Sequence, residues 1–229
     1  MLAELERDET LRALLGSGTP SEPLIELGRR VYLEALSLIA ANREQEALER
    51  AIELAETCVE QIGEQRRRLN VVVPPLACAR GCSHCCTLRV EIGPLEAQRL
   101  LPVVERRRQQ EALRALGAEL GGLSRQQRVG LGRACVFLEA DGACGAHAQR
   151  PFACRAANSR SADACRAALR HGDALGSIPV DPVPLGLIRS AAIGFGLACA
   201  DAGLQSELRE LHDALSQALA PRQTPEIAS

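Results

Sequence analysis

The sequence predicts a mainly α-helical protein, in which helices flank a central cysteine-rich region and there is little β structure. Three observations support this fold class. Apolar residues in the first 70 residues and in the last 50 recur at intervals of three, four and seven, the spacing of amphipathic helices. Leu, Ala and Val supply most apolar residues and aromatic residues only 2%, so we expect an aliphatic core. Eight cysteines interrupt the helical pattern between residues 78 and 165.

The N-terminal part of the chain is predicted to be helical with one linker. Residues 1–16 place leucines at helical spacing and predict a short amphipathic helix, followed by a turn or linker at 16–20. Residues 21–69 predict an antiparallel pair of helices with a break near Asn42. The start at Ser21 is plausible because the following Pro23 is tolerated in a first helical turn.

The centre and the C-terminal part alternate loops with shorter helices. Ser124 and Gln127 form a capping box, which predicts a helix start. In chain order we expect extended chain at 70–77, a short strand at 88–92, one helix at 95–120, a hairpin-like loop at 135–144, and helices at 161–170, 185–200 and 205–220, with a frayed tail from 221.

Three regions follow from this order. They are an N-terminal helical region at 1–70, a cysteine-cluster metal-binding domain at 71–170, and C-terminal helices at 171–229. We expect them to form one compact unit, in which the flanking helices pack around a middle that has little hydrophobic core of its own. No internal repeat is visible.

Charge and apolar runs restrict the partners and the location. The net charge is −2, and all 27 basic residues are Arg, so no global field attracts nucleic acid or a membrane. With one Tyr and three Phe, an aromatic platform for nucleic-acid bases is not expected. We see no signal peptide and no apolar run approaching a membrane span. We therefore expect a cytoplasmic protein, whose reduced thiols favour metal or redox chemistry over a disulfide framework.

Four cysteines fall within nine residues, as Cys78-x3-Cys82-x2-Cys85-Cys86. In a tight loop or a first helical turn, this spacing points the first three thiols at a common centre. Gly81 eases the tight chain path that such a loop needs. Cys86 follows Cys85 directly, so its side chain must diverge toward a second site or toward ligands from elsewhere in the chain.

Four further cysteines, Cys135, Cys144, Cys154 and Cys165, can return on separate loops to complete the coordination. Eight thiolates suit two four-coordinate sites of the zinc type, or one cubane cluster plus a mononuclear site. Soft thiolates suit zinc and iron–sulfur clusters alike, so the residues leave the metal open. The close triplet favours an iron–sulfur cluster slightly. The alternative is eight buried cysteines that bind no metal.

A family resemblance rests on these residues. The CxxxCxxCC cluster, Cys135-Val136-Phe137-Leu138 with Gly142 and Cys144, Arg150-Pro151, and Cys154-Arg155 resemble the YkgJ-type cysteine-cluster family over about residues 76–168. That family is described as a zinc- or iron-chelating domain. The resemblance implies that the eight cysteines are its ligand set and leaves Cys58 and Cys199 outside as helix-buried thiols. His147 departs from the family, whose members tend to carry a Tyr before the Arg-Pro pair.

Other residues near the cysteines allow two interpretations each. His84 and His147 are either ligands or proton donors near the metal, or solvent-facing loop residues. Arg80, Arg150 and Arg155 either donate to thiolate sulfur or lie on the surface. The run at 106–108 is predicted to be a solvated helix face, with a phosphate site as the alternative.

The expected function is metal binding, with an iron–sulfur cluster or zinc as cofactor and no defined biochemical role. One alternative is an enzyme, either redox or like the flagellin lysine methylases of one family branch. Another is a metal chaperone or store. Radical S-adenosylmethionine enzymes share the first cysteine spacing, but they need a large barrel that the remaining helical chain does not predict. The sequence identifies no catalytic residue, substrate or protein partner.

Overall fold

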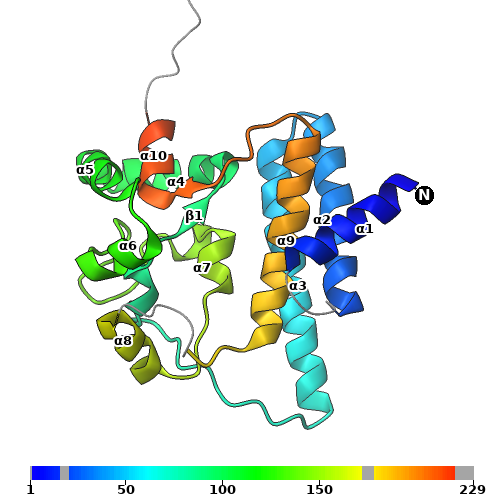
Figure 1. Cartoon of the computed structure of the whole chain (residues 1–229), viewed down its shortest axis with the longest axis horizontal. Coiled ribbons are helices and arrows are strands. Elements are labelled where there is room, and N and C mark those ends of the chain that lie inside the picture. Colours follow the sequence, from blue (N-terminus) through cyan, green and yellow to red (C-terminus); the bar gives the residue numbers. More distant parts are fainter. Residues whose placement is uncertain (1, 16–20, 172–177, 220–229) are drawn as a thin grey trace, which may run out of the picture.

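A computed structural model describes residues 2–15, 21–171 and 178–219 of the chain. The described residues form two halves that lie side by side, with the longer helices α2, α3 and α9 in one half (Figure 1). The helices are α1 (Leu2–Leu15), α2 (Glu22–Ala40), α3 (Glu44–Arg68), α4 (Pro94–Arg106), α5 (Gln110–Leu120), α6 (Arg125–Leu131), α7 (Phe152–Ala156), α8 (Ala162–His171), α9 (Pro182–Asp201) and α10 (Leu211–Ala218). Two short 3₁₀ helices, η1 (His84–Thr87) and η2 (His147–Gln149), and two strands, β1 (Glu91–Ile92) and β2 (Arg209–Glu210), complete the described elements. The mainly helical prediction is confirmed.

The first half is a helical bundle around α9. This helix packs against α1, α2 and α3, and its core is aliphatic apart from the ring contact between Phe152 and Phe195. Helices α2 and α9 approach closely at Gly28 and Gly194, where a Cβ on Gly194 would collide with the Gly28 carbonyl oxygen. The close approach of the two backbones therefore depends on glycine at this crossing.

The second half has a core of its own, contrary to the expectation of a middle with little core. Helices α4 and α5 pack against α10, and Val136 and Phe137 of the cysteine loop join them. The antiparallel pairing of β1 with β2 (Glu91 opposite Glu210) ties α10 to the chain that leaves the cysteine cluster. The added core comes from α10, a C-terminal segment that the sequence does not connect to the centre.

Several expected elements are found and two expected helices are not as predicted. The α2–α3 break at Asn42, the extended chain from 71, the capping box at Ser124 and the 135–144 hairpin are all present. The helix expected at 95–120 is instead α4 and α5, separated at Arg108, which has a φ of +52°. No glycine or proline marks that break in the sequence.

The helix expected at 205–220 is only α10, because residues 209 and 210 pair as β2 with β1. Glu210 then begins α10 by accepting hydrogen bonds from the amides of His212 and Asp213. The expected strand at 88–92 is shorter than predicted and covers only Glu91–Ile92. The linker at 16–20 and the tail from 221 lie outside the described residues.

Helix α9 is a long apolar segment, contrary to the expectation that no apolar run approaches the length of a membrane span. Its length and its mean hydropathy of 1.6 would allow it to cross a membrane. In the structure it is the central helix of the first core, where Leu187, Ala191 and Ala198 are buried. Burial in a core accounts for this composition equally well, so the absence of a membrane partner stays a prediction.

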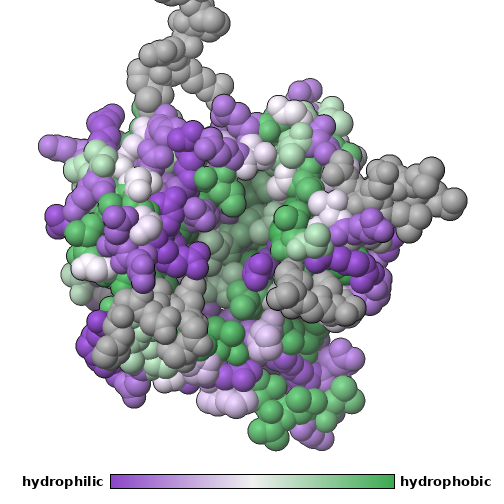
Figure 2. Space-filling model, viewed as in Figure 1, coloured by the Kyte–Doolittle hydropathy of each residue, from purple (hydrophilic) through white to green (hydrophobic). Residues whose placement is uncertain are grey.

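One apolar patch is exposed where α3 ends. Leu69, Val71 and Val72 follow this helix, and Val72 is 93% exposed. In Figure 2 an apolar cluster projects at this end of the molecule. The chain then runs extended from this patch to the first of the central cysteines.

Candidate metal centre

The chain enters the site as an extended segment that is tied to the loop after α7. The amide of Ala77 donates to the Ser159 carbonyl at 2.8 Å. The Cys78 sulfur accepts a hydrogen bond from the Ser159 amide at 3.2 Å and lies 3.7 Å from its carbonyl oxygen. Cys78 is exposed, and these contacts fix its thiol against residues 81 positions later in the chain.

Cys82, Cys85 and Cys86 follow in two tight turns. The Cys82 amide donates to the Ala79 carbonyl across Gly81, which has a φ of +87°. The Cys86 amide donates to the Ser83 carbonyl within η1. The expected tight loop is therefore present, with glycine at the left-handed position that needs it.

A second turn presses against this loop. A Cβ on Gly142, whose φ is +78°, would lie 2.6 Å from the Gly81 carbonyl oxygen. Next to this contact, Arg80 forms an exposed ion pair with Asp141 at 3.2 Å. Arg80 therefore lies on the surface, one of its two predicted alternatives, and its ion pair links the two turns.

The hairpin at 135–144 carries two of the later cysteines to the loop. The Cys135 amide donates to the Cys86 carbonyl at 2.9 Å, and Leu138 bridges to Cys144 across the hairpin. Buried His212 of α10 fixes the hairpin, because its Nε2 accepts a hydrogen bond from the Val136 amide at 3.1 Å. The other ring nitrogen of His212 lies 2.9 Å from the Glu210 carboxylate.

Cys154 and Cys165 come from separate short helices. Helix α7 begins where the Phe152 amide donates to buried Glu96 of α4 at 2.8 Å. Burial raises the pKa of Glu96, and the amides of Gly93 and Phe152 oppose that effect. Cys165 lies in α8, which packs against η1, the element that carries Cys85 and Cys86.

The pKa shifts indicate which thiols influence one another electrostatically. The pKa of the Cys78 thiol is raised by burial, and negative charge on Cys82, Cys85 or Cys165 raises it further. Burial raises the pKa of Cys135 to about 12, and the nearby Cys144 adds to that shift. Burial also raises the pKa of Cys154, with contributions from Cys135, Cys85 and Cys144.

Cys85 and Cys86 link the thiols around Cys78 with the thiols around Cys135 and Cys154. Their side chains share a hydrogen bond, which lowers the pKa of Cys85 to about 6 and raises that of Cys86. Arg150 also favours the Cys85 thiolate. On the Cys86 side, Cys135 and Cys144 are near enough to raise the pKa of its thiol. The shared hydrogen bond means that these two thiols must turn apart before each can ligate a separate ion.

Arg128 of α6 is a buried cation near Cys135. Its side chain is 0% exposed, and it donates from Nη1 to the Arg133 carbonyl. Its Nε and Nη2 atoms have no hydrogen-bond partner among the described residues. Burial lowers the pKa of Arg128, while negative charge on Glu210 and Cys135 opposes that shift. Burying a guanidinium with unpaired donors costs free energy, and nearby negative charge reduces this cost.

The expected ligands are not arranged around a common metal position in the described residues. In the described part of the chain, no three His, Cys, Asp or Glu side chains have the arrangement that holds a metal ion. All ten cysteines are free thiols. Cys199 is buried in α9 and Cys58 half-buried in α3, as expected for thiols outside the site. His147 is exposed in η2, and His84 lies in η1.

Sequence reasoning missed the residues that support the site. Ser159, His212 and Arg128 belong to no motif, and each acts through a contact with a residue distant in the chain. A histidine two residues after a glutamate was the only visible signal for the Glu210–His212 pair, and that pattern is too common to be informative.

Comparison with known proteins identifies the central segment. Residues 77–170 match the CxxCxxCC family, described as "Putative zinc- or iron-chelating domain". This match confirms the resemblance drawn from the cysteine spacing. Neither a curated protein nor a solved structure is detectably similar to the chain.

Proposed function

Because residues 77–170 belong to this family of metal-chelating domains, we propose that the protein binds metal through two sets of four cysteines. The first set takes the thiols of the opening loop and α8, namely Cys78, Cys82, Cys85 and Cys165. The second set takes the thiols of the hairpin and α7 together with the second thiol of η1, namely Cys86, Cys135, Cys144 and Cys154.

The family match supports metal binding, and the electrostatic influence of the thiols on one another supports the division into two sets. The cysteines that shift the pKa of Cys78 are all in the first set. The cysteines that shift the pKa values of Cys86 and Cys154 are in the second set, apart from Cys85. Cys85 lies at the junction, and its spacing from Cys78 and Cys82 places it in the first set. Each set then has the four thiolates that a closed zinc site or a cubane cluster requires.

Arg128 supports negative charge in the second set. Four thiolates around a divalent cation carry a net charge of −2, whereas four neutral thiols carry none. The buried guanidinium near Cys135 has two nitrogens without partners among the described residues. A thiolate site would offset this charge and would make the burial of Arg128 less costly.

Sulfur ligands bind both zinc and iron, and the close sequence spacing of the first set favours an iron–sulfur cluster there. Three of its thiols lie within eight residues, which is typical of iron–sulfur ligation. A cubane in the first set with a mononuclear ion in the second, or zinc in both, would each use all eight thiolates. Bound iron–sulfur would supply electron transfer, whereas zinc would supply stability alone. A reducing compartment such as the cytoplasm would keep the thiols available.

A metal store or chaperone is the second candidate function. Cys78 and Cys85 are exposed, whereas the thiols of the second set are half-buried. The first set would therefore exchange its metal faster than the second. A cluster-dependent enzyme would have an open coordination position or a substrate pocket beside the cluster, and eight thiolates leave no open position in two four-coordinate sites.

The deciding experiment is elemental analysis with a visible spectrum on protein purified without oxygen. We expect brown protein with iron and acid-labile sulfide, or colourless protein with two zinc ions per chain. A Cys58→Ser, Cys199→Ser double variant is the matched control and should keep full metal content. Protein that binds neither metal after reconstitution would refute the proposal.

A further inference from the structure

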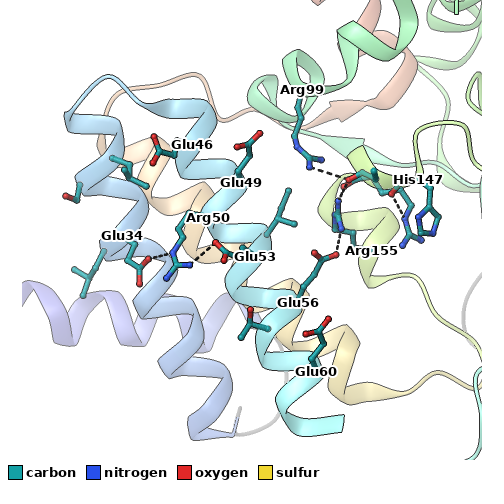
Figure 3. A pocket seen from close by; sticks show the side chains of 17 residues that line it. Glu34, Glu46, Glu49, Arg50, Glu53, Glu56, Glu60, Arg99, His147 and Arg155 are labelled. Atoms are coloured by element: carbon teal, nitrogen blue, oxygen red, sulfur yellow. Dashed lines mark hydrogen bonds and ion pairs between the residues drawn. The ribbon is translucent and has the colours of Figure 1, made fainter. Parts of the chain in front are cut away.

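A second candidate site lies in a cleft between α3 and the cysteine-rich half. The cleft has a volume of about 1190 Å³, and its lining residues come from α2 and α3 on one side and from α4, η2 and α7 on the other (Figure 3). Pockets for small molecules usually measure about 300–1,000 Å³. The space is therefore large enough for an extended ligand.

One wall of the cleft is acidic. Helix α3 presents Glu46, Glu49, Glu53, Glu56 and Glu60 at spacings of three and four, so they share one helix face (Figure 3). Glu46 pairs with Arg43 and Glu53 with Arg50. Among the described residues, Glu49 and Glu60 have no hydrogen-bond or ion-pair partner. This wall therefore presents two uncompensated carboxylates.

The opposite wall is basic. Arg99 of α4 and Arg155 of α7 both donate to the Ala148 carbonyl, at 3.3 and 2.6 Å, and Arg150 donates to the His147 carbonyl. The Nη1 atom of Arg99 is buried and has no partner within the described residues. Arg150, together with burial and Arg155, lowers the pKa of His147, which reflects the excess positive charge here.

The two walls do not neutralise each other. Among the described charged side chains that line the cleft, one ion pair joins the walls, between Arg155 and Glu56. Glu49, Glu60, Arg99 and Arg150 thus keep their charges available on facing surfaces. A ligand that matches both walls must carry an acidic group and a basic group.

The length of the acidic face indicates the size of the ligand. Glu46 and Glu60 are fourteen residues apart, which corresponds to about 21 Å along a helix. An extended peptide rises about 3.4 Å per residue, so roughly six residues span this face. We propose that the cleft binds an extended peptide segment of mixed charge, with acidic side chains toward Arg99 and Arg150 and basic side chains toward Glu49 and Glu60.

This proposal rests on the cleft and holds whether or not the cysteines bind metal. The test uses calorimetric titration of the full chain, as purified, with the capped peptide Asp-Gly-Ala-Gly-Ala-Lys. The neutral peptide Asn-Gly-Ala-Gly-Ala-Gln and free lysine serve as comparison ligands. We expect the charged peptide to bind, more weakly at high salt, and the two comparison ligands to bind at least about tenfold more weakly.

Variants place the binding in the cleft. Arg99→Gln, Glu49→Gln and Glu60→Gln should each weaken the charged peptide about tenfold, because each removes a charged partner in a partly desolvated site. The matched controls are Arg133→Gln and Glu119→Gln, which break an exposed ion pair outside the cleft lining. Circular dichroism identifies variants that misfold, and the use of three separate cleft variants means that one misfolded variant does not prevent the test.

Two results would overturn the proposal. The first is equal affinity for the charged peptide, the neutral peptide and free lysine. The second is unchanged affinity in the folded cleft variants. Loss of metal from the wild-type protein with peptide binding intact would contradict only the metal proposal.

Discussion

Arg128 shows at the scale of one residue how the cysteine site and its surroundings depend on each other. The guanidinium is buried near Cys135 and Glu210, yet two of its nitrogens have no partner among the described residues. Glu210 offsets only part of this charge, and a buried charge that lacks hydrogen-bond partners destabilises a folded chain, whereas the same charge beside thiolates stabilises them. Its contribution should therefore change sign between the metal-free and the metal-bound protein.

Arg128→Met tests this sign change. Met fills a similar volume without charge, so the metal-free variant should be as stable as wild type or more stable. Its metal affinity should fall about tenfold, because the thiolates of the second set lose a compensating cation. Urea unfolding of the metal-free protein and competition with a chelator measure the two effects. A variant with unchanged metal affinity and a loss of about 2 kcal/mol in the metal-free state would show that Arg128 is only structural.

At the scale of elements, the crossing of α2 and α9 depends on single glycines. A Cβ on Gly194 would meet the backbone of Gly28, whereas nothing lies within 4 Å of a Cβ on Gly196 of the same helix. Gly194→Ala should destabilise the protein by about 1–3 kcal/mol through overpacking. Gly196→Ala should stabilise it by up to about 1 kcal/mol, because alanine favours helix. Thermal unfolding of the pair measures the difference, and equal midpoints would contradict this packing.

Asp181 connects three elements through one buried carboxylate. It caps α9 at the amide of Val183, pairs with Arg66 at the end of α3, and contacts Arg160 in the loop before α8. Burial alone would raise the pKa of Asp181, but these three partners outweigh it and lower the pKa below its usual 3.8. The carboxylate therefore stabilises the fold above about pH 4, and this contribution is lost as the pH falls through its lowered pKa.

Asp181→Asn should therefore show a pH-dependent defect. At pH 7 we expect a loss of about 2–4 kcal/mol, because the change leaves Arg66 without its charged partner and weakens the helix cap. Below about pH 4 the unfolded wild-type chain binds a proton on this carboxylate more readily than the folded protein does, so the difference in stability between the two proteins should shrink as the pH falls toward the lowered pKa. Urea unfolding at pH 7 and pH 3 compares them. A defect of the same size at both values would indicate lost packing instead of lost charge.

The sequence predicts elements that local signals determine and misses those that distant contacts determine. The α2–α3 break and the capping box at Ser124 follow from neighbouring residues. The break at Arg108 does not, because a non-glycine residue takes a positive φ there and the Gln109 side chain then donates to the Val136 carbonyl. Strand β2 likewise exists only because β1 lies beside it.

The candidate site follows the same division. The spacing of the cysteines predicts the tight loop, since it depends on adjacent residues, but not the hydrogen bond that holds the Cys85 and Cys86 side chains together. The assignment of Cys78 and Cys165 to one set depends on the Ser159 contacts and on the packing of α8 on η1. These contacts connect parts of the chain that are 87 positions apart, so the sequence does not predict them. His212 and Arg128 come from helices outside any motif, so composition and spacing cannot reveal them.

At the scale of the whole molecule, the two halves have separate cores and should respond differently to metal removal. The bundle of α2, α3 and α9 is held by apolar packing, whereas the cysteine loops at 77–90 and 147–170 lie mostly outside both cores. Chelation should therefore raise amide exchange in these loops and leave the bundle protected. Hydrogen-exchange mass spectrometry with and without chelator measures this. Equal protection in both states would show that metal does not organise the loops.

Metal content per chain in three single variants tests the account most directly. Cys165→Ser removes a thiol of the first set, Cys144→Ser one of the second, and Cys199→Ser one outside both. We predict that Cys165→Ser and Cys144→Ser each lose the metal of one set and retain that of the other, while Cys199→Ser matches wild type. Full metal content in all three variants, or equal loss in all three, would contradict two sets of four thiolates.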